Sequence, residues 1–174
     1  MLSCRLRLCG QRVGRRLCCE SWNPFESHFH GKRKITIGDD VFIGRRVMIH
    51  VSSKAELAIG DNCFFTGDAY LRVSRSVKLG NGVGVAEYCT IRDANHKTAA
   101  GVPFRAQGSV YAPIEIGNDV WVGSGCRVLM GAKIPDGVVV GANSVVTRSC
   151  VFEPGCIYAG APARFVKRRK PREN

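Results

Sequence analysis

The chain has 174 residues, of which 45% are hydrophobic and 23% are charged, proportions typical of one globular domain. No stretch approaches the roughly 18 to 20 consecutive apolar residues that a membrane-spanning helix needs, and the composition is not that of a low-complexity chain. The net charge is +12, and most of the excess lies at the two ends of the chain. A nucleic-acid-binding protein more often spreads its basic residues over a folded face, so we expect no nucleic-acid partner.

Residues 1–34 are predicted to form a basic N-terminal extension. Solvated charge is the simplest interpretation of this segment, and weak contact with an anionic membrane surface is the alternative. Four of the nine cysteines fall here, and none of the nine shows C-x-x-C or zinc-ligand spacing. We therefore expect free thiols, a reducing cytoplasmic location and no metal site.

A repeat with a period of six residues runs through the predicted domain, residues 35–162. Four segments open alike, with Ile or Leu, then Gly, then Asp or Asn, at residues 37, 59, 79 and 116. The position four residues after each apolar one is Val or a small residue, with Arg75 and Asn95 as the exceptions. The apolar positions of the repeat all carry Ile, Val, Leu or Phe and are residues 37, 43, 49, 59, 65, 71, 79, 85, 91, 116, 122, 128, 134, 140 and 146.

This period fits neither a helix of 3.6 residues per turn nor a simple alternating strand. It fits a short strand followed by a tight turn, three times per coil, with one large apolar side chain inside each face. The small position is expected to point inward near each corner, and it holds Cys63, Cys89, Cys126 and Cys150 as packing residues. Glycine directly after the apolar residue is expected to supply turn conformations. Stacked coils would bury one continuous column, as in other solenoids.

Residues 97–113 interrupt the repeat. The coil starts at 37, 59 and 79 are separated by 22 and 20 residues, whereas the next start follows only at residue 116. No hexads are legible in residues 97–113, so we predict an excursion loop that leaves the column. Long loops without structure of their own are usually functional. Residues 163–174 are predicted to form a basic C-terminal tail.

The repeat resembles that of the left-handed parallel β-helix acyltransferases, and most of all the maltose, galactoside and polysaccharide O-acetyltransferases. The resemblance covers roughly residues 35–168. It is most specific in the order of four segments: Asp93-Ala-Asn95-His96, then the loop, then PIEIGNDVWVGS at 113–124, VGANSVVT at 140–147 and AGAPARFVK at 159–167. It implies an all-β fold, a left-handed parallel β-helix built from hexapeptide repeats, with acetyl-CoA as cosubstrate and no metal.

The resemblance makes His96 the catalytic base, which takes the proton from an acceptor hydroxyl that then attacks the acetyl thioester. A neutral imidazole suits that work near pH 7. Asp93 and Asn95 are expected to orient the imidazole or the acceptor, and the alternative is that they shape the base of the loop. On the third face of successive coils, His50, Arg72 and Arg92 occupy equivalent positions. They form either a polar acceptor surface or a solvated face.

The same resemblance implies a groove for coenzyme A between neighbouring subunits of a homotrimer. The residues that match cofactor-binding positions are Trp121, Ser124, Ala142, Thr147, Arg164 and Lys167. A zinc enzyme on this fold would need three convergent imidazoles. Only His50 and His96 lie in the coils, whereas His28 and His30 precede them, which argues against such a site.

The leading functional hypothesis is an acetyl-CoA-dependent O-acetyltransferase. Its expected acceptor is a sugar hydroxyl in a polysaccharide or lipopolysaccharide precursor. Galactoside- and maltose-type sugar contacts do not carry over, because Gly67 and Ser74 stand at the nearest positions. The alternatives are an acetyltransferase for a drug, an amino acid or a free sugar, and a β-helix scaffold without catalysis.

Overall fold

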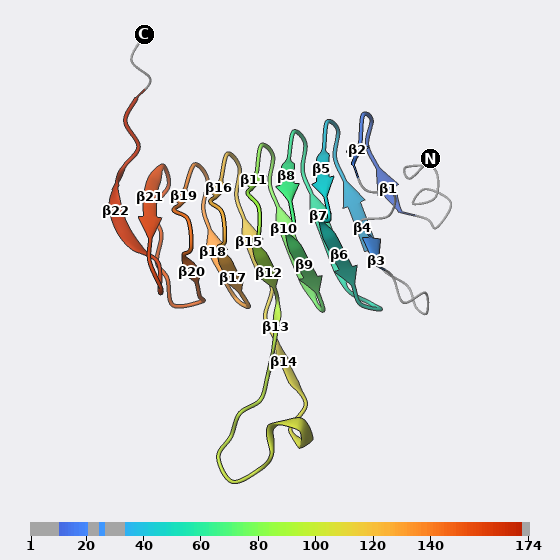
Figure 1. Cartoon of the computed structure of the whole chain (residues 1–174), viewed down its shortest axis with the longest axis vertical. Coiled ribbons are helices and arrows are strands. Elements are labelled where there is room, and N and C mark those ends of the chain that lie inside the picture. Colours follow the sequence, from blue (N-terminus) through green and yellow to red (C-terminus); the bar gives the residue numbers. More distant parts are fainter. Residues whose placement is uncertain (1–10, 21–24, 27–33, 172–174) are drawn as a thin grey trace.

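The computed structural model describes residues 11–20, 25–26 and 34–171, which form a left-handed parallel β-helix with one long projecting loop (Figure 1). Three parallel sheets make the faces of the solenoid. The first sheet contains β1 (Arg12–Val13), β4 (Lys34–Ile37), β7 (Glu56–Ile59), β10 (Ser76–Leu79), β15 (Ile114–Ile116) and β18 (Lys133–Ile134). The second contains β2 (Cys18–Cys19), β5 (Phe42–Arg45), β8 (Phe64–Gly67), β11 (Gly84–Val85), β16 (Trp121–Val122), β19 (Val139–Val140), β21 (Cys156–Ala159) and β22 (Arg164–Arg168). The third contains β3 (Phe25–Glu26), β6 (Met48–Val51), β9 (Tyr70–Val73), β12 (Thr90–Arg92), β17 (Arg127–Leu129) and β20 (Val145–Val146).

Each coil visits the three sheets in turn and therefore has three corners. The Asx corner joins the first sheet to the second, the Ser124 corner joins the second to the third, and the loop corner joins the third to the next strand of the first. No helix in the described segments is long and apolar enough to cross a bilayer.

The interior column is the one that the hexads predict. All fifteen predicted apolar positions are buried, and none is more than 4% exposed. Each coil contributes one such side chain per face, and successive coils stack them into a single core cluster. Burial of an aliphatic side chain contributes about 1.5–3 kcal/mol, so this column is the main source of stability.

The small inward position is confirmed at two corners, and at the loop corner it is buried at Ala132 but not in the coils before it. Cys63, Cys89 and Cys126 are buried, as predicted, but Ser53 and Arg75 are exposed. The reason is the length of the coils of 22 and 20 residues. Their strands next to the loop corner have four residues each, so that Val51, Ala55, Val73 and Val77 fill the interior there. Because of the extra residues, the predicted small position faces outward in these coils. Near the last coil, Cys150 is only half-buried.

The Asp or Asn of the opening motif has a clear structural role at the Asx corner. Its side-chain oxygen accepts the backbone N–H of the equivalent residue one coil earlier. The N–H of Asp39 reaches Asp61 at 2.7 Å, and that of Asn118 reaches Asp136 at 2.7 Å. Two rungs between them, Asp61 to Asn81 and Asn81 to Asn118, are 2.8 and 2.9 Å long. This Asx ladder satisfies corner amides that the strands leave unpaired.

The glycines after the apolar positions serve close packing, which corrects the expectation that they supply turn conformations. A Cβ on Gly44 would lie 2.0 Å from the carbonyl oxygen of Thr66 in the next coil, so no side chain fits. The positive φ angles fall two residues later in most hexads, at non-glycine residues such as Asp40, Asn62 and Asn143 and at glycines such as Gly82 and Gly125. Asn and Asp tolerate that conformation better than most residues.

The excursion loop leaves the column between β12 and β15 and projects far from it, as predicted (Figure 1). Its base is a hairpin in which β13 (Ala94–His96) pairs antiparallel with β14 (Ser109–Tyr111). A single turn of 3-10 helix, η1 (Phe104–Ala106), precedes the returning strand. The side-chain amide of Gln107 donates to the carbonyls of Ala99 and Val102 and ties the loop together.

Short strands extend the three sheets on both sides of the predicted domain, residues 35–162. Strands β1, β2 and β3 pair parallel with β4, β5 and β6. At the other end, β22 pairs antiparallel with β21, which places Arg164–Arg168 at the edge of the second sheet. His28 and His30 lie outside the described residues.

Candidate active site

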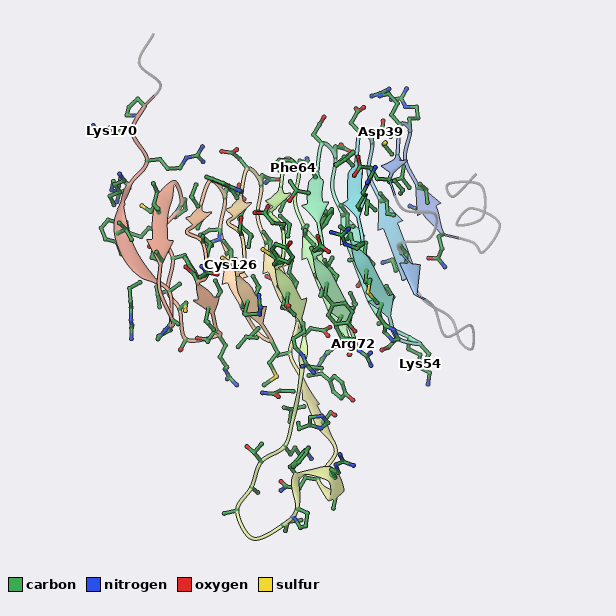
Figure 2. All side chains as sticks on the ribbon, viewed as in Figure 1. Asp39, Lys54, Phe64, Arg72, Cys126 and Lys170 are labelled. Carbon is green, nitrogen blue, oxygen red and sulfur yellow. The ribbon has the colours of Figure 1, made fainter. Side chains whose placement is uncertain are left out.

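A small cavity of about 220 Å³ lies at the loop corner, where β9 and β12 end and the hairpin begins. Figure 2 shows Arg72 at this edge of the solenoid, beside the base of the loop. The cavity brings predicted residues from two coils and both hairpin strands together. It is lined by Tyr70, Arg72, Ser74, Arg92, Ala94, Asn95, His96, Ser109 and Tyr111.

His96 stands at the end of β13 with its side chain exposed. The ring of Phe104 from η1 packs edge-on against the imidazole, with the centroids 5.5 Å apart. Within the described residues no hydrogen bond occupies either ring nitrogen, and the hydrogen bond to Asn95 is donated by the backbone N–H of His96. An imidazole with a free nitrogen at the mouth of a polar cavity can accept a proton from a bound hydroxyl.

Of the two roles predicted for Asp93, its contacts fit the one in which it shapes the base of the loop. Its side chain is fully buried, and its carboxylate accepts backbone N–H bonds from Ser74, Arg75 and Ser76, each 2.7 Å long. These residues form the turn between β9 and β10 in the preceding coil. The carboxylate thus anchors the corner under the cavity, and it is absent from the cavity lining.

Asn95 lines the cavity and is exposed. Its side-chain oxygen accepts the backbone N–H of His96 at 2.9 Å, so it braces the strand that carries the histidine. The amide nitrogen has no partner among the described residues and is available to an acceptor.

Three of the predicted cofactor residues lie near the Ser124 corner. Trp121 on β16 is 53% exposed on the second sheet, and Ala142 is exposed one coil further along. The hydroxyl of Ser124 donates to the carboxylate of Glu87 at 2.6 Å. This hydrogen bond, followed by those from the backbone and from Thr66, lowers the pKa of Glu87. The sequence analysis missed Glu87, because nothing in the hexad pattern marks it as a partner for Ser124.

The other three cofactor candidates lie elsewhere. Thr147 follows β20 at the loop corner, where its hydroxyl contacts that of Ser149 at 2.8 Å. It is therefore on the His96 edge, two coils away, which is about 10 Å along the axis. Arg164 and Lys167 are exposed on β22, and neither has an acidic partner in the described residues. By contrast, the neighbouring Arg168 pairs with Glu153.

One chain therefore does not bring all the candidates together. His96 is at the loop corner, whereas Ser124 is at the opposite end of the third sheet. One strand and the turns at its two ends separate these corners, which corresponds to a distance on the order of 15 Å. Within one chain these two groups are therefore not adjacent.

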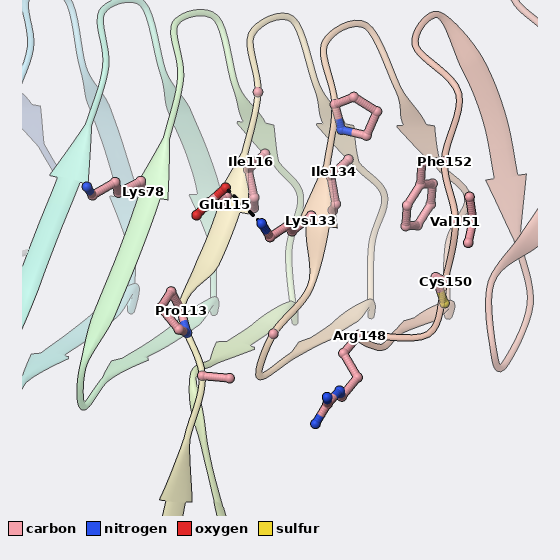
Figure 3. Close-up of a pocket in the computed structure, with 14 residues that line it drawn as sticks. Lys78, Pro113, Glu115, Ile116, Lys133, Ile134, Arg148, Cys150, Val151 and Phe152 are labelled. Atoms are coloured by element: carbon pink, nitrogen blue, oxygen red, sulfur yellow. Dashed lines mark ion pairs between the residues drawn. The ribbon is translucent and has the colours of Figure 1, made fainter.

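A second hollow lies on the first sheet and is a separate feature (Figure 3). It has a volume of about 930 Å³, and the ion pair between Glu115 and Lys133 crosses its floor. Arg148, Val151 and Phe152 close the side where the first sheet ends. None of the predicted site residues lines it, whereas Asn95 and His96 both line the smaller cavity. No group of His, Cys, Asp or Glu in the described segments has the arrangement of a metal site.

Comparisons with known proteins agree with this architecture. Residues 113–148 match the family described as bacterial transferase hexapeptide (six repeats), and residues 56–86 match the hexapeptide repeat of succinyl-transferase. The galactoside O-acetyltransferase of Escherichia coli is 33% identical over 99 residues, which are 56% of this chain and 47% of that protein. A putative lipopolysaccharide biosynthesis O-acetyl transferase of the same organism, WbbJ, is 34% identical over 101 residues, which are 53% of this chain and 50% of that protein. The chain thus matches about half the length of these relatives.

Among solved structures, an N-acyltransferase from Bacillus cereus, AntD, in complex with dTDP and coenzyme A has a similar fold. The TM-score is 0.72 at 20% identity, over 91% of this chain and 84% of that one. The matched repeats and the curated relatives make the chain similar to the hexapeptide-repeat acyltransferases, and the solved structure shows that it shares their solenoid fold.

Proposed function

We propose that the protein is an acetyl-CoA-dependent O-acetyltransferase that modifies a sugar hydroxyl in a polysaccharide or lipopolysaccharide precursor, with His96 as the general base. The observation that supports this most is the free imidazole of His96 at the mouth of a polar cavity, beside two tyrosines and two serines. The names of the two curated relatives, a galactoside and a lipopolysaccharide O-acetyltransferase, favour a saccharide acceptor. The coenzyme A in the AntD structure favours an acyl-CoA donor.

In the proposed reaction the imidazole of His96 takes the proton from the acceptor hydroxyl. The oxygen attacks the thioester carbonyl of acetyl-CoA, the carbon–sulfur bond breaks, and an ester forms. The proton passes from the imidazolium to the leaving thiolate, so the products are the acetylated sugar and free coenzyme A. The edge-on contact with Phe104 holds the ring, and Asn95 braces the backbone behind it.

We also propose that the working form is a homotrimer in which each site lies between two subunits. In this arrangement one subunit supplies His96 and its neighbour supplies Trp121, Ser124 and Ala142. The separation of the loop corner from the Ser124 corner within one chain supports it. Small residues such as Ala142 leave room for a cofactor arm along the corner.

Turnover of acetyl-CoA, followed by release of free thiol, tests the proposal directly. His96→Ala is expected to lower kcat by about 10²–10⁴-fold, since a general base contributes that much. Calorimetry should show unchanged coenzyme A binding, because the residue is not part of the cofactor groove.

Lys54→Gln is the matched control, because Lys54 is exposed on the same corner but outside the cavity. It should retain wild-type turnover. Absence of turnover with every sugar, drug and amino-acid acceptor, together with no coenzyme A binding, would leave the scaffold hypothesis instead.

A further inference from the structure

Two arginines stand next to each other in the cavity beside His96. Arg72 on β9 and Arg92 on β12 are register partners in the third sheet, and both line the cavity. The sequence analysis expected this equivalence, and the strand register confirms it, with His50 on β6 as the next position in the row. Like charges directly opposite each other on neighbouring strands destabilise a sheet. A bound anion would offset that cost.

No carboxylate compensates these two charges in the described part of the chain. Neither guanidinium takes part in an ion pair or a hydrogen bond there. Elsewhere on the solenoid, several basic residues do pair with an acid in the adjacent coil, as Arg46 does with Asp68 and Lys34 with Glu56. The nearest acid in sequence, Asp93, is fully buried and occupied by three backbone amides.

The rest of the cavity lining is neutral and rich in hydroxyl groups. Tyr70 and Tyr111 supply aromatic faces and phenol groups, and Ser74 and Ser109 supply hydroxyls. A guanidinium presents a planar fork of donors that matches a carboxylate or a phosphate in two-point geometry. Two such forks beside the proposed base make a receptor for an oxyanion that carries a hydroxyl nearby.

We propose that the acceptor is anionic: a saccharide whose phosphate or carboxylate group binds Arg72 and Arg92 while its hydroxyl meets His96. This inference rests on the proposed function and narrows its substrate class. The cavity of about 220 Å³ is smaller than the roughly 300–1,000 Å³ that encloses a drug-sized ligand, which suits one charged sugar ring. Phosphate and carboxylate share the required chemistry, and the experiment separates them.

The first test compares acceptors that differ only in charge. Thiol release is measured with glucose, galactose and N-acetylglucosamine, with the phosphate ester of each, and with glucuronate and galacturonate. The anionic members are expected to have kcat/KM at least about 10-fold above the neutral sugars, since a hydrogen bond to a charged group contributes about that factor or more. The KM for the anionic acceptor should rise with ionic strength.

Arg72→Gln and Arg92→Gln should each lower kcat/KM for the preferred anionic acceptor by about 10- to 100-fold, and should lower it less for the neutral sugars. Arg75→Gln is the matched control. Its side chain is exposed at the same corner but is not part of the cavity lining, so the preference for the anion should persist. Arg72→Lys keeps the charge without the fork and should fall between wild type and Arg72→Gln. Thermal melting confirms that each variant is folded.

A binding measurement keeps the inference separable from the proposed activity. Calorimetry on the His96→Ala protein, with the same sugar phosphates and uronates, should show binding that Arg72→Gln weakens. Equal use of neutral and anionic sugars, or equal loss for both in the arginine variants, would overturn the inference while the acetyltransferase proposal stands. The same holds if the arginines prove to pair with a carboxylate of a second subunit and bind no anion. Conversely, binding of an anionic sugar without any acetyl-CoA turnover would support the inference and contradict the proposed activity.

Discussion

Asp93 lies three residues before His96, and its carboxylate stabilises a turn of the solenoid. It immediately precedes the hairpin that carries His96, yet its oxygens face three backbone N–H groups of the preceding coil. A single side chain therefore closes the turn at Ser74–Ser76 and fixes the point where the loop leaves the column. The base of the excursion loop and the coil before it are joined through this residue.

We predict that Asp93→Ala destabilises the fold by about 2–4 kcal/mol, because three amides lose their acceptor and part of that loss is made up by water. Thermal melting at a fixed protein concentration measures the effect. Asn95→Ala, an exposed change two residues away, should alter stability by less than about 0.5 kcal/mol. An Asp93→Ala protein with wild-type stability and a raised KM for the acceptor would instead show a substrate-binding role.

At the level of elements, the hexads predict the fold well because each coil repeats the same burial problem. The fifteen apolar positions, the excursion loop and the row of Arg72 and Arg92 follow directly from the period. The period does not predict which residues face inward at the loop corner. Four extra residues in one coil and two in the next change which positions face inward, and the period alone does not say where extra residues are placed.

The direction of a corner side chain is likewise invisible in the sequence. Asp93 and Asn95 are both polar, both adjacent to His96 and two residues apart. One is buried and the other exposed because the chain turns from a parallel coil into an antiparallel hairpin between them. Glu87 was missed for a related reason, since it meets Ser124 only through the stacking of two coils that the loop separates in sequence.

The Asx ladder makes a prediction about pH. The backbone N–H of Asn118, and then its side-chain amide, lower the pKa of Asp136 below its ordinary value. A carboxylate whose pKa is lower in the folded state stabilises the fold at pH values above the unfolded pKa of about 3.9. That contribution disappears as the pH falls through the lower, folded pKa.

Asp136→Asn should therefore flatten the acid side of the stability profile. The Asn oxygen can accept the same N–H without titrating, as Asn81 and Asn118 already do in the ladder. We expect the melting temperature of the variant to fall less than that of the wild type between about pH 5 and pH 3. Parallel curves for the two proteins would show that this rung does not contribute to acid sensitivity.

On the scale of the whole molecule, the residues proposed for acceptor chemistry and those proposed for cofactor binding lie on different edges of the solenoid. His96 and the arginine pair lie at the loop corner, whereas Trp121, Ser124 and Ala142 lie toward the opposite end of the third sheet. The long loop extends away from its own column, where it is free to contact a neighbouring one (Figure 1). From this separation we propose that a complete site needs two chains.

Complementation between two inactive proteins tests that claim most directly. One protein carries His96→Ala, and the other carries Ala142→Trp, which fills the cofactor corner. Each is expected to be inactive alone in the acetyl-CoA assay. When the two are co-expressed in equal amounts, about a quarter of the sites in random mixed trimers combine an intact His96 with an intact cofactor corner. The account predicts recovery of that fraction of wild-type turnover. No recovery from trimers shown to be mixed would contradict it and place the whole site within a single chain.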